Sequence, residues 1–110
     1  FEYNNNDRKY IIGTGNYRFI TKWSGSGNGS IYAYGDIGYI AGRKDFPKYN
    51  EMIEFDYSSH VRTIYDDEIV IFRNGFGKFL AIKIISVDSR SHGKEKDVMT
   101  FEYRIIKENI

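Results

Sequence analysis

The side chains best suited to chemistry cluster between Ser58 and Arg62. Ser59 and His60 are neighbours, as a nucleophile and its base might be, and Arg62 follows two positions later. On a strand, however, successive side chains point to opposite faces, so Ser59 and His60 are poorly placed to share a proton. His60 and Arg62 would share one face, which suits contact with a carboxylate or another anion. The alternative interpretation is a solvated strand face.

A second candidate is the glycine cluster within Lys22–Asp36. Gly25, Gly27 and Gly29 occupy three of five consecutive positions. Phosphate-binding loops use the free N–H groups and the dipole of the helix that follows their glycines. Here the residues that follow alternate as a strand would, and no Lys-Ser or Lys-Thr pair closes the motif. We therefore predict a hairpin turn rather than a nucleotide site.

Carboxylates are the third candidate for chemistry. Asp66, Asp67 and Glu68 are adjacent, and such residues before a strand are more typical of turns and caps than of an acid-base pair. Two further pairs could meet in space: Glu54 with Asp56, and Asp88 with Asp97. With no Cys and two His, a zinc site would need carboxylates to complete it. We expect no catalytic residue, metal or cofactor, and a small hydrolase is the least favoured alternative.

Hydrophobic periodicity indicates the elements that must position these residues. Segment 17–23 alternates in polarity, segments 68–73 and 78–87 are apolar on both faces as central strands are, and segment 98–106 alternates again. Segment 41–53 holds the single Pro and fits an irregular crossing or one helical turn. The hydrophilic run 88–97 fits an exposed loop.

These segments predict a single all-β domain over residues 1–110. Short strands joined by turn signals favour a mainly antiparallel, barrel-like or sandwich fold of about seven or eight strands. The expected buried side of segment 98–106 consists of Met99, Phe101, Tyr103 and Ile105. The core is predicted to contain Phe19, Trp23, Ile69, Ile71, Leu80, Ile82, Ile84, Phe101 and Ile105.

Charge and composition narrow the classes of partner. Sixteen basic and fifteen acidic residues give a net charge of +1, which removes the usual argument for non-specific binding to nucleic acid or to a membrane surface. No apolar run approaches the roughly 20 residues that cross a bilayer, and no signal-peptide pattern is present. We expect a cytoplasmic protein whose partner is another protein or a small polar ligand, with the oligomeric state open.

Aromatic residues make up 17% of the chain and suggest where a ligand would bind. Exposed Tyr and Trp rings bind sugars, bases or peptides by stacking, and Arg or carboxylate groups beside them orient a polar ligand. The predicted site therefore combines these groups: Trp23, Ser24, Tyr34, Asp36, His60, Arg62 and Arg90. A carbohydrate-binding module that uses exposed Tyr and Trp is the alternative.

Five stretches carry a resemblance to a known family. They are Tyr10–Phe19 (YIIGTGNYRF), Thr21–Ser24 (TKWS), Ile31–Asp36 (IYAYGD), Phe55–Thr63 (FDYSSHVRT) and Phe101–Tyr103 (FEY). In this order they resemble a module that accompanies the Toll/interleukin-1-receptor (TIR) domain in some bacterial proteins. The resemblance covers most of the chain.

The resemblance implies a C-terminal accessory domain of a larger intracellular protein with a signalling or defence role. That agrees with a first residue other than Met, from which we expect a segment of a longer chain. The family offers no catalytic residues to transfer, so the expected function is non-catalytic binding or interaction in support of a neighbouring domain. Two features depart from its pattern: the glycine-rich turn at Gly25–Gly29, and His60 where a second basic residue is expected before Arg62.

Overall fold

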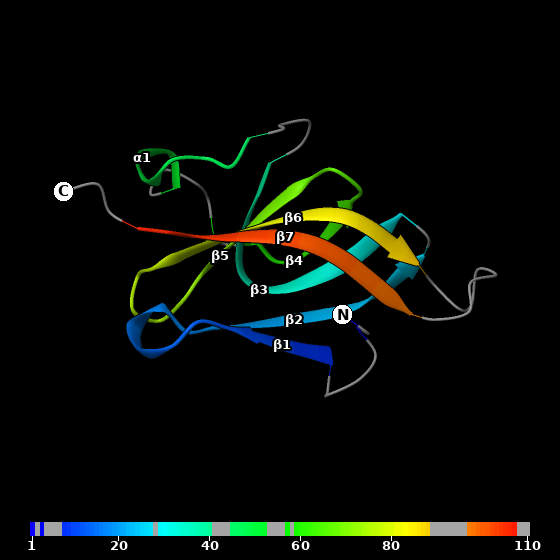
Figure 1. The fold of residues 1–110 in the computed structure, drawn as a ribbon, viewed down its shortest axis with the longest axis horizontal. Helices are drawn as coiled ribbons and strands as arrows, with labels where there is room; N and C mark the ends of the chain where they lie inside the picture. The colour runs from blue at the N-terminus through cyan, green and yellow to red at the C-terminus, as the bar shows by residue number, and fades with distance from the viewer. Residues whose placement is uncertain are drawn as a thin grey trace.

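The computed structural model describes residues 1, 3, 8–27, 29–40, 45–52, 57, 59–88 and 97–107. Within these ranges the chain forms seven strands, one short 3-10 turn and one helical turn (Figure 1). In chain order they are β1 (Lys9–Ile12), η2 (Gly15–Tyr17), β2 (Phe19–Gly27), β3 (Ser30–Ile40), α1 (Tyr49–Met52), β4 (Ser59–Tyr65), β5 (Ile69–Arg73), β6 (Phe79–Asp88) and β7 (Val98–Ile106). Every strand pairing is antiparallel, so the predicted all-β class is confirmed.

The glycine cluster turns the chain between β2 and β3, as predicted. Ser24 lies opposite Tyr32 and Gly25 opposite Ile31, which defines a hairpin. Gly29 has a φ of 75°, a left-handed conformation that glycine adopts without steric cost. Its N–H donates to the Val87 carbonyl at 2.9 Å, so the turn is also tied to β6. The residues after the cluster form a strand and not a helix, so the cluster lacks the helix N-terminus that a phosphate loop needs.

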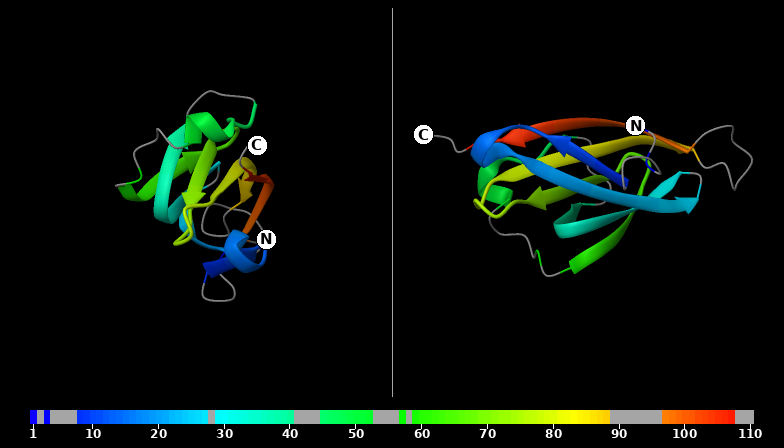
Figure 2. Two further views of the ribbon diagram at one scale, coloured as in Figure 1. Left: turned by 90° about the vertical axis from the view of Figure 1, so that its left-hand side faces the viewer. Right: turned by 90° about the horizontal axis from the view of Figure 1, so that it is seen from below.

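Strand β3 joins two parts of the sheet. Its first half pairs with β2 on one edge and with β4 on the other, whereas Ile37 to Ile40 pair with β5. The change of partner falls at an irregularity between Tyr34 and Ile37, where Gly35 has a φ of 137°. The bend lets the strands wrap into two facing layers (Figure 2). The order is β1-β2-β3-β5-β6-β7 with β4 beside β3, and β1 does not pair with β7 in this order. The described strands therefore form a sandwich-like fold and not a closed barrel.

The core lies between these layers and continues behind β5 and β6. One cluster includes Trp23, Phe72 and Met99, and the Trp23 and Phe72 rings lie 5.4 Å apart. A second cluster packs Ile69 and Phe79 against Met52 of α1. Segments 68–73 and 78–87 are thus covered on both faces, as their continuous apolar pattern predicts. Of the nine predicted core residues, all are buried except Phe101 and Ile105, which are partly buried and pack against the first cluster.

Candidate functional site

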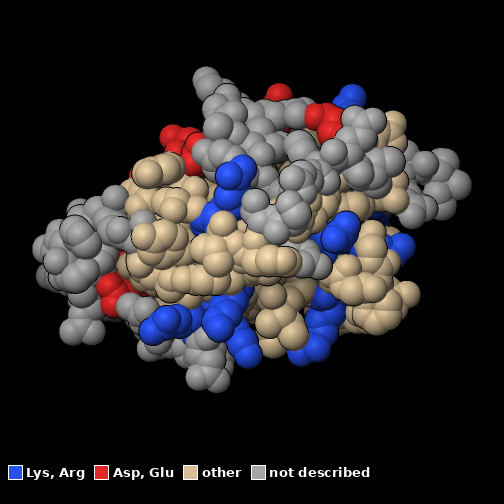
Figure 3. All heavy atoms as spheres, turned by 180° about the vertical axis from the view of Figure 1, so that it is seen from behind, with Lys and Arg blue, Asp and Glu red and all other residues tan. Residues whose placement is uncertain are grey.

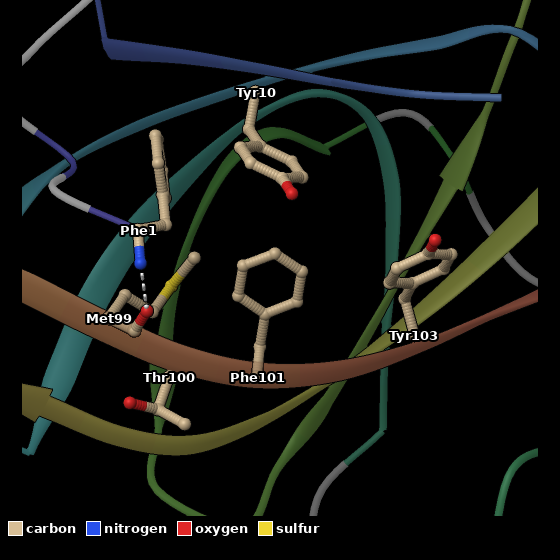
Figure 4. Close-up of a pocket in the computed structure, with 6 residues that line it drawn as sticks. All are labelled: Phe1, Tyr10, Met99, Thr100, Phe101 and Tyr103. Carbon is tan, nitrogen blue, oxygen red and sulfur yellow. Dashed lines mark hydrogen bonds between the residues drawn. The ribbon is translucent and has the colours of Figure 1, made fainter.

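A pocket of about 280 Å³ lies between the two end strands, β1 and β7. Figure 4 shows its lining: one ring projects from β1 and two from β7, with the side chain of the first residue beside them. The lining residues are Phe1, Tyr10, Met99, Thr100, Phe101 and Tyr103. Four of the six are aromatic, so we name this feature the aromatic pocket.

The alternation of β7 explains why these rings meet. Met99, Phe101 and Tyr103 are two residues apart and therefore share one face of the strand. Along that face the exposed fraction rises from 0% at Met99 to 51% at Tyr103. Ile105, the next residue on this face, is partly buried and packs against the core, so the face is most open to water at Tyr103. Tyr10 of β1 lies opposite the buried Thr21, on the inner face of its own strand, and is 38% exposed.

The rings contact one another in edge-to-face and tilted pairs. The Tyr10 and Phe101 ring centroids lie 5.4 Å apart at 83°, and those of Phe1 and Tyr10 lie 5.0 Å apart at 58°. Phe101 also contacts Phe1 at 6.5 Å and Tyr103 at 6.4 Å. These separations are within the range in which aromatic pairs attract one another. Phe101 is therefore the centre of the cluster and the ring that links β1 to β7.

The pocket is lined mainly by apolar side-chain groups. Its six lining side chains include no carboxylate, imidazole or ammonium group. The hydroxyls of Tyr10 and Tyr103 lie beside the rings, whereas the Thr100 side chain points to the other side of β7 (Figure 4). Partly exposed rings can hold an apolar or aromatic group, while nearby hydroxyls can accept or donate hydrogen bonds.

The ligand site predicted from the sequence lies elsewhere and includes Trp23. Its side chain is completely buried, so it is not available to a ligand at the surface. Trp23 Nε1 donates to Thr21 Oγ1 at 2.8 Å, and Thr21 Oγ1 donates to the Tyr10 carbonyl at 2.7 Å. The indole N–H is satisfied within the protein, and Trp23 is a core residue.

The other described members of the predicted site lie on two faces of the sheet. Ser24 and Tyr34 share the outer face, where their hydroxyl oxygens lie 2.7 Å apart and Lys22 Nζ is 6.0 Å from the Tyr34 ring centroid. Arg62 lies opposite Ala33, which lies opposite Trp23, so these three occupy the inner face. His60 shares the face of Arg62 by alternation, and both side chains are exposed. The Asp36 side chain and all of Arg90 lie outside the described residues.

The acidic segment 66–68 forms a turn. The Asp66 N–H donates to the Gly29 carbonyl at 3.0 Å, and Glu68 Oε1 accepts a hydrogen bond from the Tyr65 N–H at 2.8 Å. Burial raises the pKa of Asp66, and the charges of Asp67 and Asp88 raise it further. Such contacts belong to a turn residue. Glu54 and Asp56 lie outside the described residues.

Other kinds of site receive less support. Among the residues that the structure describes, no group of three or more His, Asp or Glu side chains could hold a metal ion. On the face seen in Figure 3, Lys and Arg side chains lie mostly along the lower part, others lie higher up, and uncharged groups separate many of them. Within the described ranges, no helix is both long and apolar enough to span a bilayer.

Comparison with known proteins adds no further assignment: no protein-family model, curated protein or solved structure matches this chain.

The aromatic pocket could not be predicted from the sequence, for a geometric reason. The alternation in segment 98–106 correctly puts Met99 and Phe101 on one side, but it cannot show that this side is open to water at Tyr103. Nor does it show that Phe1 and Tyr10, about ninety positions earlier in the chain, complete the lining.

Proposed function

We propose that this chain is a non-catalytic binding module whose ligand inserts a side chain or ring into the aromatic pocket. The observation that carries the proposal is the partial exposure of aromatic rings around a concave space: Tyr103 is 51% exposed and Tyr10 38% exposed. Large rings at a rim lose contact with water when a ligand covers them, and a well-placed ring pair adds about 0.5–1.5 kcal/mol beyond that burial.

The size of the pocket limits what can enter it. Sites for drug-sized ligands occupy about 300–1,000 Å³, and this one has about 280 Å³. It therefore suits one aromatic or aliphatic side chain better than a large cofactor. A ligand that binds with useful affinity would also need to contact the protein outside the pocket.

The resemblance to a TIR-associated module suggests the setting in which such binding would act. We propose that the chain supports a neighbouring signalling or defence domain in a bacterial cytoplasmic protein, by holding a partner rather than by transforming a substrate. The resemblance is the sole support for that setting.

Carbohydrate binding is the second candidate function. Tyr10 and Tyr103 provide hydroxyls on partly exposed rings, which favours it. However, a sugar-binding surface would present a flat row of rings, whereas Phe101 meets Tyr10 at 83° and Tyr103 at 43°. The tilted arrangement favours a protruding side chain over a flat sugar ring.

Titration followed by amide NMR tests the binding function. The probes are N-acetyl-phenylalaninamide and cellobiose, each added to the chain at concentrations up to tens of millimolar. We expect the first probe to shift Thr100, Phe101 and Tyr103 with a Kd of about a millimolar, because small ligands gain only about 0.3 kcal/mol or somewhat more per heavy atom. Preferential shifts with cellobiose at the same residues would favour the second candidate.

Two variants serve as the matched pair for this titration. Tyr103→Ala should abolish the shifts, whereas Tyr65→Ala should leave them unchanged, because Tyr65 is equally exposed at 56% but lies on β4. If neither probe shifts any residue of the pocket, the proposed binding function is wrong.

A further inference from the structure

The outer edge of β7 already holds one residue in the manner of an added strand. The Phe1 nitrogen donates to the Met99 carbonyl at 3.0 Å, and the Met99 N–H donates to the Phe1 carbonyl at 2.7 Å. Two residues that exchange both hydrogen bonds form the closely bonded pair of an antiparallel ladder. The main chain at Phe1 therefore lies on the side of β7 opposite to β6.

This pair fixes which other groups of β7 face the same way. The main-chain N–H and C=O groups of alternate residues point to the same edge of a strand. Since those of Met99 point away from β6, those of Phe101 and Tyr103 do so as well. Among the described residues no strand pairs with this edge, and Phe1 exchanges backbone hydrogen bonds with Met99. No described backbone therefore covers the edge between Phe101 and Tyr103.

The aromatic pocket lies directly along this edge. Phe101 and Tyr103 line it with their side chains, and Thr100, which points to the opposite face of β7, lines it as well. The Thr100 side chain points away from the rings (Figure 4), so the part of Thr100 beside the pocket is its main chain. The ring of Phe1 shows where the side chain of an added residue goes, because it contacts both Tyr10 and Phe101.

Only a short part of the outer edge of β7 is available for pairing with an added segment. Phe1 occupies the position opposite Met99. At the other end, Ile105 Cδ1 lies only 3.3 Å from where a Cβ on Gly13 would be, so the end of β1 approaches β7 there. Two outward-facing positions, Phe101 and Tyr103, lie between these limits. An added segment of about five residues would span them at roughly 3.4 Å per residue.

We propose that the ligand of the aromatic pocket is an extended polypeptide segment that adds to the outer edge of β7, antiparallel to it. Its main chain bonds to Phe101 and Tyr103, and one aromatic or aliphatic side chain enters the pocket. The inference rests on the proposed binding function and specifies the partner. Main-chain bonds supply the contacts outside the pocket, and the pocket selects the side chain, as in other cases of strand addition.

The test begins with peptide selection. A library of random nine-residue peptides is selected for binding to the chain and counter-selected against Tyr103→Ala. We expect enriched peptides to share one aromatic or aliphatic residue within a run of β-branched or aromatic residues that lacks Pro, because Pro lacks the N–H that the edge would accept. Failure to enrich any peptide over the counter-selection would overturn the inference.

Backbone methylation of a selected peptide then tests the pairing itself. Replacing successive amide N–H groups by N-methyl should weaken binding about tenfold or more at alternate positions only, since the methyl group removes a hydrogen bond and also clashes with the edge. A peptide that tolerates methylation at every position would contradict strand addition. This measurement leaves the protein unchanged, so it does not depend on how a variant folds.

The outcomes separate this inference from the function on which it rests. If N-acetyl-phenylalaninamide shifts the pocket residues but no peptide shows the alternating pattern, the pocket binds ligands and the strand addition is wrong. If peptides bind equally to the chain and to its Tyr103→Ala variant, while the amide probe shifts nothing, both proposals fail.

Discussion

At the scale of single residues, buried tyrosine hydroxyls hold parts of the fold together that apolar contacts alone would leave loose. Tyr57 is 6% exposed and donates its hydroxyl hydrogen to the Met52 carbonyl at 2.8 Å, which ties the start of the β4 segment to α1. Tyr3 is fully buried and donates in the same way to the Asp88 carbonyl at 2.7 Å. In both cases burial requires the phenol to remain neutral and hydrogen-bonded.

The pKa of Tyr57 makes its contribution to the stability of the fold depend on pH. Burial raises it well above the usual value of 10.0, and the nearby Arg73 opposes the shift only in part. Because the folded-state pKa is the higher one, the contribution of Tyr57 to stability is fully present below about pH 10 and is lost as pH rises through the folded-state value.

Urea unfolding between pH 7 and pH 11 tests this expectation. The free energy of unfolding should fall above about pH 10 by more in the unaltered chain than in Tyr57→Phe. At pH 7 the variant should lose about 0.5–1.5 kcal/mol, the usual contribution of one hydrogen bond. Tyr65→Phe is the matched control, since Tyr65 is 56% exposed. Identical pH profiles for Tyr57→Phe and the unaltered chain would contradict the assignment.

At the scale of elements, sequence periodicity predicts the strands and their bounds well and the burial of single side chains less well. Segment 98–106 illustrates both results: Met99 is buried as predicted, whereas Tyr103, predicted to be buried with it, is 51% exposed. Strand β6 contains an irregularity between Ile84 and Ser86 that a period of two cannot show. As a consequence Ile84 and Val87, three residues apart, are both buried, and Ile85 is 37% exposed.

Hydrogen exchange can compare the N–H groups on the two edges of β7. The N–H groups of Thr100 and Glu102 point toward β6 and should exchange slowly. Those of Phe101 and Tyr103 point away from β6 and should exchange much faster, because none of the described strands pairs with that edge. Amide exchange measured by NMR gives each rate separately. Equal protection at all four positions would mean that another segment already covers this edge.

At the scale of the whole molecule, the fold class could be predicted from the sequence, whereas the residues that lie together in space could not. Apolar runs in β5 and β6 correctly indicated strands covered on both faces. The members of the predicted site were chosen by residue type, and type does not show placement: Trp23 lies in the core, while Ser24 and Arg62 face opposite sides of the sheet. Which residues meet depends on the bend in β3, and no local pattern sets its angle.

Ile37 tests whether the two parts of the sheet behave as one unit. It is fully buried and lies opposite both Ser59 of β4 and Phe72 of β5. Ile37→Ala should lower the free energy of unfolding by about 2–5 kcal/mol, as large-to-small core substitutions do. The transition followed by Trp23 fluorescence should still coincide with that followed by far-UV circular dichroism.

The matched control is Ile20→Ala, because Ile20 is 51% exposed on β2 and its replacement should cost about 1 kcal/mol or less. If Ile37→Ala made the fluorescence and dichroism transitions separate, β3 would be a boundary between independently melting parts rather than the strand that unites them.

The double role of β3 also affects the order in which the chain folds. The β2–β3, β5–β6 and β6–β7 pairings join strands that are neighbours in sequence, so they close short loops. The pairing of Ile37 with Phe72 must close a loop of about 35 residues, which costs more chain entropy and is slower to form. The hairpins can therefore form early, and the step that commits the chain to its native topology is the arrival of β5 at the far half of β3. Since Phe1 reaches Met99 across almost the entire chain, its contact depends on that step and should be among the last to form.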